Sequence, residues 1–244
     1  MADKNTSVRL DRFLANQAGV SRSDAKELIK KRLVTVNGAV AKLYDMKIDP
    51  ESDVVAAEGR EIVYRKHIYI MMNKPQGVVC STWDGESKTV LDLLPPELYR
   101  EAVFPAGRLD KDTEGFVFLT DDGELAHNIL SPKKHVEKLY FARLEKPAEE
   151  SYIARFAEGM EIDGGDICLP AKLEILDDPH EVYITIREGM YHQIKRMAEA
   201  LGNKIVYLKR LRIGGLDLDG NLALGECREM LHKEVEKIYT NFVP

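Results

Sequence analysis

The sequence contains little that is typical of membrane-spanning or disulfide-stapled proteins. No apolar run in its 244 residues is long enough to span a bilayer, and the residues after Met1 form no apolar signal-peptide core. It has only three cysteines, Cys80, Cys168 and Cys227, and their spacing fits neither a disulfide framework nor a CxxC zinc site. We therefore expect a cytoplasmic protein whose cysteines are reduced.

Internal repeats, low-complexity tracts, a glycine-rich phosphate loop and a cluster of metal-ligating residues are also missing from the sequence. We therefore expect neither a cofactor nor a metal. The length is sufficient for one sizeable core with a small additional module, and we expect a monomer.

Charge is distributed unevenly along the chain. The net charge is −6, which is unusual for a protein that binds RNA. Residues 7–47 nevertheless contain nine Lys or Arg against four Asp or Glu, a net of +5, whereas the remainder contains 26 against 37, a net of −11. A basic module on an acidic body is typical of a nucleic-acid footprint confined to one part of a chain. Ordinary scatter of charge is the alternative.

The basic segment has the pattern of two short helices followed by a β-hairpin. Apolar side chains at helical spacing precede Gly19, and Ser21 with Asp24 three residues later resembles the capping box of a second helix. A strand-like run then leads to Asn37-Gly38, a strong signal for a type I′ turn. This order resembles the S4 RNA-binding domain over residues 8–55. The resemblance implies an RNA-binding surface made of Arg9, Arg22, Lys26, Lys30, Lys31 and Arg32.

The rest of the chain alternates between strand-like and turn-like segments. We place the domain boundary in a turn-rich linker, which gives an S4 module of residues 1–60 and a larger domain of residues 61–244. Many strands are joined by hairpins and few by helices. We therefore expect an α+β fold whose larger domain has a mixed, largely antiparallel sheet with peripheral helices. The predicted elements include strands at residues 68–72, 78–80, 116–120 and 136–144 and helices at residues 124–130, 151–157 and 191–201.

The most informative segment is the loop Gly107-Arg108-Leu109-Asp110-Lys111-Asp112-Thr113-Glu114-Gly115. It resembles the central motif of pseudouridine synthases, which break and remake the glycosidic bond of a uridine in RNA. The resemblance implies that Asp110 is the catalytic carboxylate and that Arg108, Leu109 and Thr113 support it in the active-site loop. A lone loop Asp usually caps a turn, but the complete motif favours catalysis.

Three further segments resemble motifs of the same family. Asn73-Lys74-Pro75-Gln76-Gly77 resembles a turn that packs beside the active site, which makes Asn73 and Lys74 supporting residues. Lys138-Leu139-Tyr140 resembles the segment whose tyrosine ring stacks on the target base. Residues 188–197 resemble a motif that opens a helix, in which Lys195 pairs with Asp110 and keeps it ionised.

Two more side chains are assigned from their neighbours in these motifs. Arg196 is expected to contact a phosphate, since it points about 100° away from Lys195 on the helix. Leu208 is expected to line the uracil pocket, and the resemblance gives His192 no catalytic role. Taken singly, each pattern has a structural alternative: a strand-to-turn signal at 73–77, a half-buried strand tyrosine at 140, a solvated helix face at 195–196, and core packing of Leu208.

The form of these motifs, the S4 module and the short length together resemble the RsuA-like branch of the family. The resemblance implies a pseudouridine synthase that acts on one flipped-out uridine of 16S ribosomal RNA, either as naked RNA or within an assembling small subunit. Three alternatives remain open: a member of the same family that acts on 23S ribosomal RNA, a non-catalytic RNA-binding assembly factor, and a glycoside hydrolase, which needs two carboxylates flanking one bond.

Overall fold

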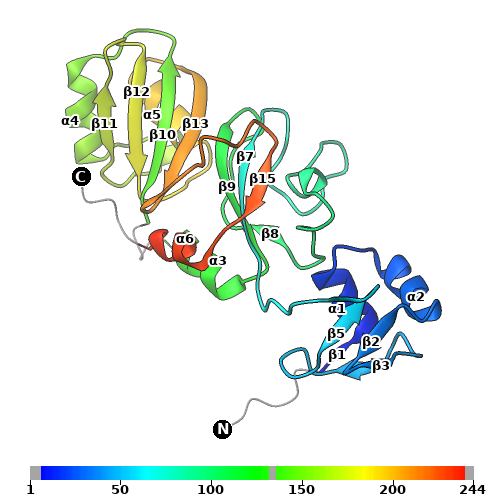
Figure 1. Ribbon diagram of the computed structural model, residues 1–244. Helices are drawn as coiled ribbons and strands as arrows, with labels where there is room; N and C mark the ends of the chain where they lie inside the picture. The colour runs from blue at the N-terminus through cyan, green and yellow to red at the C-terminus, as the bar shows by residue number, and fades with distance from the viewer. Residues whose placement is uncertain (1–6, 132–135, 240–244) are drawn as a thin grey trace. The chain divides into compact units, whose positions relative to one another are not determined.

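The structure is a computed structural model that describes residues 7–131 and 136–239 (Figure 1). The chain forms two compact units. One consists of the residues up to Ile68 together with Leu94–Val103, and the other of Tyr69–Leu93 together with the residues from Phe104 onward. Within the described residues, no helix has the length and apolar character needed to cross a membrane.

The N-terminal unit packs two helices against small sheets. The helices are α1 (Leu10–Gln17) and α2 (Arg22–Lys30), and their apolar faces share one core with the strands, including Phe13, Ile29 and Val34. The four-stranded sheet has the order β3-β2-β5-β6, and β1 pairs separately with β4. The strands are β1 (Val8–Arg9), β2 (Val34–Val36), β3 (Ala39–Val40), β4 (Lys47–Ile48), β5 (Val55–Ala57) and β6 (Arg60–Glu61).

Two local predictions in this unit are confirmed in detail. The Ser21 hydroxyl accepts a hydrogen bond of 3.0 Å from the backbone N–H of Asp24, so that Ser21 caps α2. Asn37 and Gly38 have φ angles of 51° and 79°, as a type I′ turn between β2 and β3 requires.

The domain boundary lies elsewhere than predicted. A boundary between residues 60 and 61 cuts β6, which pairs with β5 through a turn at Glu58-Gly59. The compact unit continues to Ile68 and also takes in Leu94–Val103. Gly19 allows this second segment to approach, since a Cβ at Gly19 would lie 2.7 Å from the Cα of Glu97.

The larger unit is built on a nine-stranded sheet with the order β11-β12-β10-β13-β9-β7-β15 (Figure 1). In addition, β8 pairs with β9, and β14 pairs with β13. Strand β13 runs parallel to β9, and the other pairs in this sheet are antiparallel. This confirms the predicted α+β fold with a mixed, largely antiparallel sheet. The strands are β7 (Tyr69–Lys74), β8 (Phe104–Pro105), β9 (Glu114–Thr120), β10 (Lys138–Leu144), β11 (Lys172–Ile175), β12 (Glu181–Ile186), β13 (Ile205–Ile213), β14 (Leu216–Asp217) and β15 (Cys227–Glu229).

Helices lie beside this sheet. Ala126 and Ile129 of α3 (Gly123–Leu130) share a core with Val235 of α6 (His232–Lys237) and Phe118 of β9. Helix α4 (Glu150–Glu158) packs against β11, and α5 (Gln193–Ala200) contacts β13 (Figure 1). Two short 3₁₀ helices are η1 (Leu91–Leu93) and η3 (Asp163–Gly165).

The strand predicted at residues 78–80 is wrong. This segment forms only an isolated bridge between Val79 and Thr89. Strand β7 ends before Pro75, and Gly77 turns the chain with a φ of 82°, so the following residues leave the sheet. They become part of the loop that precedes η1.

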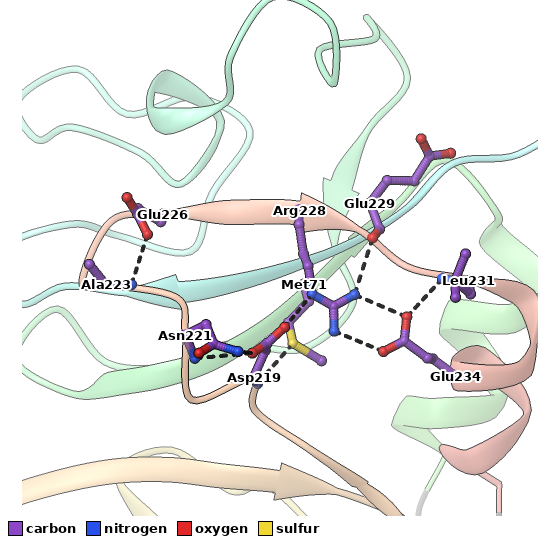
Figure 2. Close-up of polar contacts among 9 residues, drawn as sticks. All are labelled: Met71, Asp219, Asn221, Ala223, Glu226, Arg228, Glu229, Leu231 and Glu234. Carbon is purple, nitrogen blue, oxygen red and sulfur yellow. Dashed lines mark hydrogen bonds and ion pairs between the residues drawn. The ribbon is translucent and has the colours of Figure 1, made fainter.

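An ion-pair network fixes the C-terminal part of this unit (Figure 2). Arg228 on β15 lies 2.7 Å from Asp219 and donates to both carboxylate oxygens of Glu234 at 2.8 and 3.0 Å. Glu234 also accepts from the backbone N–H of Leu231 at 2.8 Å, which covers the start of α6. The hydrogen bonds from Arg228 lower the pKa of Glu234. The network therefore holds α6 against β15 with charges that stay ionised at neutral pH.

Candidate active site

Asp110 lies in the loop between β8 and β9 and lines a cavity of about 790 Å³ in the larger unit. The loop is held in place by Lys74, the last residue of β7. Lys74 is fully buried, and its Nζ donates to the carbonyl oxygens of Pro75 at 2.9 Å and Thr113 at 2.7 Å. Burial lowers the pKa of Lys74. The first motif thus packs against the loop, and its lysine fixes the backbone around Asp110.

The structure brings the predicted charge partner to Asp110. The Nζ of Lys195, on α5, lies 2.9 Å from Oδ2 of Asp110 and 2.6 Å from Oδ1 of Asp112. Although partial burial opposes the charge, the hydrogen bonds to these two carboxylates raise the pKa of Lys195. Burial also opposes ionisation of Asp112, but the hydrogen bond and charge of Lys195 lower the pKa of that carboxyl. A cation therefore holds one oxygen of Asp110 and leaves the carboxylate at the cavity wall.

His192 makes a second side-chain contact with Asp110, one that the sequence did not predict. Its Nε2 lies 3.5 Å from Oδ1 of Asp110, and its backbone is left-handed with a φ of 49°. Buried Gln193 fixes this turn by accepting from the N–H of Met190 at 3.1 Å and donating to Glu188 at 2.8 Å. The strained residue also explains why α5 begins at Gln193, later than predicted.

Tyr140 lies on β10 and forms a buried part of the cavity wall. It pairs in register with Arg210 of β13, whose Nη1 lies 3.4 Å from the tyrosine hydroxyl. Arg210 also donates through Nε to the carbonyl of Phe116 at 2.7 Å. The wall therefore combines an aromatic ring with a buried cation.

Lys138 is a second buried cation that lines the same cavity. Its Nζ donates to the carbonyl of Val136 at 2.9 Å. Burial, and then the charge of Arg210, lowers the pKa of Lys138 to about 8. The alternation of β10 was visible in the sequence, but the pairing with β13 that brings Arg210 beside it was not.

The remaining predicted support residues divide into two groups. Arg108, Leu109, Thr113 and Leu208 line the cavity, with Leu208 buried and Arg108 exposed. Asn73 is buried and donates to the carbonyl of Leu222 at 2.8 Å, so it supports the neighbouring backbone rather than the cavity.

From its position on the helix, Arg196 was expected to reach outward for a phosphate, but its side chain does not. Its guanidinium pairs with Asp163 and with Asp166 at 2.9 Å, and it donates to the carbonyl of Tyr191 at 3.2 Å. Only 14% of its side chain is exposed. Arg196 therefore ties α5 to the η3 turn, because two acidic residues far away in sequence lie beside it.

The predicted RNA-binding cations of the N-terminal unit are all exposed. Two of them surround Tyr44, with the Arg9 guanidinium 5.6 Å and the Lys26 amine 5.1 Å from the ring centroid. Arg9 is also held by buried Asp11 at 2.8 Å. Looser ion pairs join Arg22 to Glu101 at 3.4 Å and Lys30 to Glu27 at 3.7 Å, and the basic run ends with Lys31 and Arg32.

The larger unit thus presents an ion-paired carboxylate, a tyrosine and buried cations at one cavity. In residues 7–131 and 136–239, no group of three or more His, Cys, Asp or Glu side chains is placed to hold a metal ion. The arrangement is suited to an organic substrate that meets a nucleophile or base at Asp110 and a flat surface at Tyr140.

Comparison with known proteins agrees with this arrangement. The family model described as RNA pseudouridylate synthase matches residues 68–200, and that of the S4 domain matches residues 8–55. The chain is 48% identical over 231 residues to the "Uncharacterized RNA pseudouridine synthase YtzG" of Bacillus subtilis (strain 168), covering 93% of this chain and 97% of that protein.

It is also 44% identical to the "Ribosomal small subunit pseudouridine synthase A" of Escherichia coli (strain K12), covering 95% of this chain and 100% of the relative. Among solved structures, it is similar to "Crystal structure of pseudouridylate synthase", with a TM-score of 0.65 and 43% identity. That likeness covers 95% of this chain and 100% of the solved chain.

Proposed function

The chain belongs to the RNA pseudouridylate synthase family and is an RNA pseudouridine synthase, and from this premise we propose that it modifies one uridine of 16S ribosomal RNA. Asp110 is the catalytic carboxylate in this proposal, assisted by Tyr140 and Lys195. The observation that carries it is the 2.9 Å ion pair between Lys195 and Asp110 at the cavity wall. The reaction is an isomerisation that changes no oxidation state, so the proposal includes no cofactor.

The target uridine leaves its strand and enters the cavity, whose volume of about 790 Å³ lies in the usual range of small-molecule sites. Asp110 then attacks C1′ or removes the proton of the neighbouring sugar carbon. The C1′–N1 bond breaks, and uracil leaves with the electron pair. After the base rotates, C5 bonds to C1′ as the Asp110–C1′ bond breaks or, on the second route, as Asp110 returns the proton to the neighbouring sugar carbon. The proton on C5 then passes to solvent, and N1 takes up a proton.

The surroundings of Asp110 support these steps. Lys195 lies 2.9 Å from one carboxylate oxygen of Asp110 and so orients this side chain at the cavity wall. The Tyr140 ring offers a face on which uracil can stack. Lys138 and Arg210, both buried beside it, stabilise the negative charge that uracil carries while it is detached.

The N-terminal unit anchors the RNA in this proposal. Its exposed Lys and Arg side chains contact phosphates, and this attraction weakens as salt rises. The basic run Lys30-Lys31-Arg32 at the end of α2 is its densest charge. The name of the Escherichia coli relative, together with coverage of its whole length, favours small-subunit RNA as the substrate.

The proposal is tested by pseudouridine mapping after incubation of the protein with 16S and 23S transcripts and with assembling small subunits. We expect one new pseudouridine in 16S RNA or in the small subunit, and none with D110N. Modification confined to 23S RNA would overturn the substrate but leave the role of Asp110 intact. No modification of any of these RNAs would overturn the proposal.

A further inference from the structure

Two exposed aromatic side chains lie on segments that line the cavity. Trp83 is 78% exposed and Tyr191 is 75% exposed, more than any other large apolar side chain of the described residues. Tyr191 lines the cavity itself, and Ser81 and Asp84, on either side of Trp83, line it as well. A single exposed aromatic is ordinary, but two of them on the segments that line one cavity indicate a surface that a ligand covers.

The backbone that carries Trp83 is fixed. The Ser81 hydroxyl donates to the carbonyl of Trp83 at 2.6 Å, and the Asp84 carboxylate accepts from the N–H of Ser87 at 2.7 Å. The Lys111 amine donates to the Ser87 hydroxyl at 3.0 Å, which joins this loop to the loop of Asp110. The indole is therefore presented on an ordered turn that is tied to the catalytic loop.

Tyr191 is connected to Asp110 through His192. The rings of Tyr191 and His192 are stacked, with centroids 3.8 Å apart and planes 17° from parallel. His192 in turn lies 3.5 Å from Asp110. One face of the tyrosine ring is thus covered by the imidazole, while the ring as a whole remains mostly exposed.

We propose that Trp83 and Tyr191 stack on the unpaired nucleobases that flank the target uridine. This inference rests on the proposed function. When a uridine leaves its strand, its neighbours lose a stacking partner, and an aromatic ring replaces it for any base. Arg108 and Lys111 provide cations at the same rim for the intervening phosphates. Aromatic rings beside cations fit single-stranded RNA.

The sequence contains one tryptophan, so fluorescence excited at a wavelength that tyrosine does not absorb reports on Trp83 alone. We expect single-stranded oligouridine to quench this fluorescence in the full-length D110N protein, which binds without turnover. Double-stranded RNA of the same length should quench much less. Binding measured by anisotropy without quenching, or equal quenching by the duplex, would overturn the inference. Neither result depends on whether D110N has lost activity.

Kinetics provide the second arm. W83A and Y191A each remove the ring on which one base stacks. Each should therefore raise KM for the RNA about 5-fold to about 150-fold, with little change in kcat. W83F and Y191F keep an aromatic ring, so their KM values should lie much closer to the wild-type value. The matched control is I167A, which removes a side chain that is 73% exposed and does not line the cavity. Unchanged KM in W83A and Y191A, or a loss confined to kcat, would overturn the inference while the wild-type protein still modifies RNA.

Discussion

Gly115 is the position at which one methyl group most directly tests the architecture of the site. It lies in β9 with a φ of 102°, and it pairs with Arg210 across the parallel junction with β13. A Cβ at this position would lie 2.2 Å from the carbonyl oxygen of Arg210 and 2.8 Å from its nitrogen. Both are backbone atoms and cannot rotate away, so G115A must push the two strands apart.

The expected cost has two parts. A non-glycine residue in this region of φ costs about 1–3 kcal/mol, and forcing extra volume into a packed site costs about 1–3 kcal/mol more. We therefore expect G115A to lower the free energy of unfolding by about 2–6 kcal/mol. With a slope of about 3 kcal/mol/M, the urea midpoint of the larger unit falls by about 0.7–2 M. Activity should fall too, since Arg210 and Tyr140 move with β13.

The matched control is G123A at the first residue of α3. Apart from its chain neighbours and the backbone of its own helix, no atom of the described residues lies within 4 Å of a Cβ at that glycine, and its φ is not in the left-handed region. G123A should be neutral or stabilise by up to about 1 kcal/mol. If the free energy of unfolding of G115A, measured by circular dichroism, lies within about 0.5 kcal/mol of the wild-type value, β9 and β13 do not approach each other as described.

Three further perturbations test separate parts of the account. K195M should lower kcat at least about tenfold and raise the pKa of Asp112, measured by NMR, because the cation that holds both carboxylates is lost; an unchanged pKa would contradict the ion pair. Lys138 loses its proton above about pH 8 in the folded state but keeps it up to about pH 10.5 in the unfolded state. The free energy of unfolding should therefore rise with pH between these two values, by up to about 3 kcal/mol. This rise should be missing in K138M. Replacing residues 30–32 with glutamine should lower the salt dependence of RNA binding by about two to three counterions, and an unchanged slope would exclude this run from the RNA surface.

The N-terminal unit was predictable in detail because its signals are local. A cap at Ser21 and a turn at Asn37-Gly38 each depend on residues that are close together in sequence. Leu94–Val103 packs onto this unit because Gly19 has no side chain that would block its approach. No pattern among neighbouring residues of the sequence predicts this contact.

The residues of the candidate site also include some that the sequence predicted and some that it did not. Asp110 and Lys195 were predicted together because each lies in a motif with a recognisable spacing, and the structure places them 2.9 Å apart. Arg210 was missed because its position beside Tyr140 results from the register of β10 with β13. Arg196 was assigned to a phosphate because helix geometry gives its direction but not the acidic turn that lies there.

The central claim is that Asp110 carries the isomerisation. Release of tritium from C5-labelled uridine in ribosomal RNA measures that reaction directly. We expect release by the wild-type protein and none above background by D110N, while D112N, which changes the other carboxylate on Lys195, keeps measurable activity. Release by D110N at the wild-type rate would contradict the account.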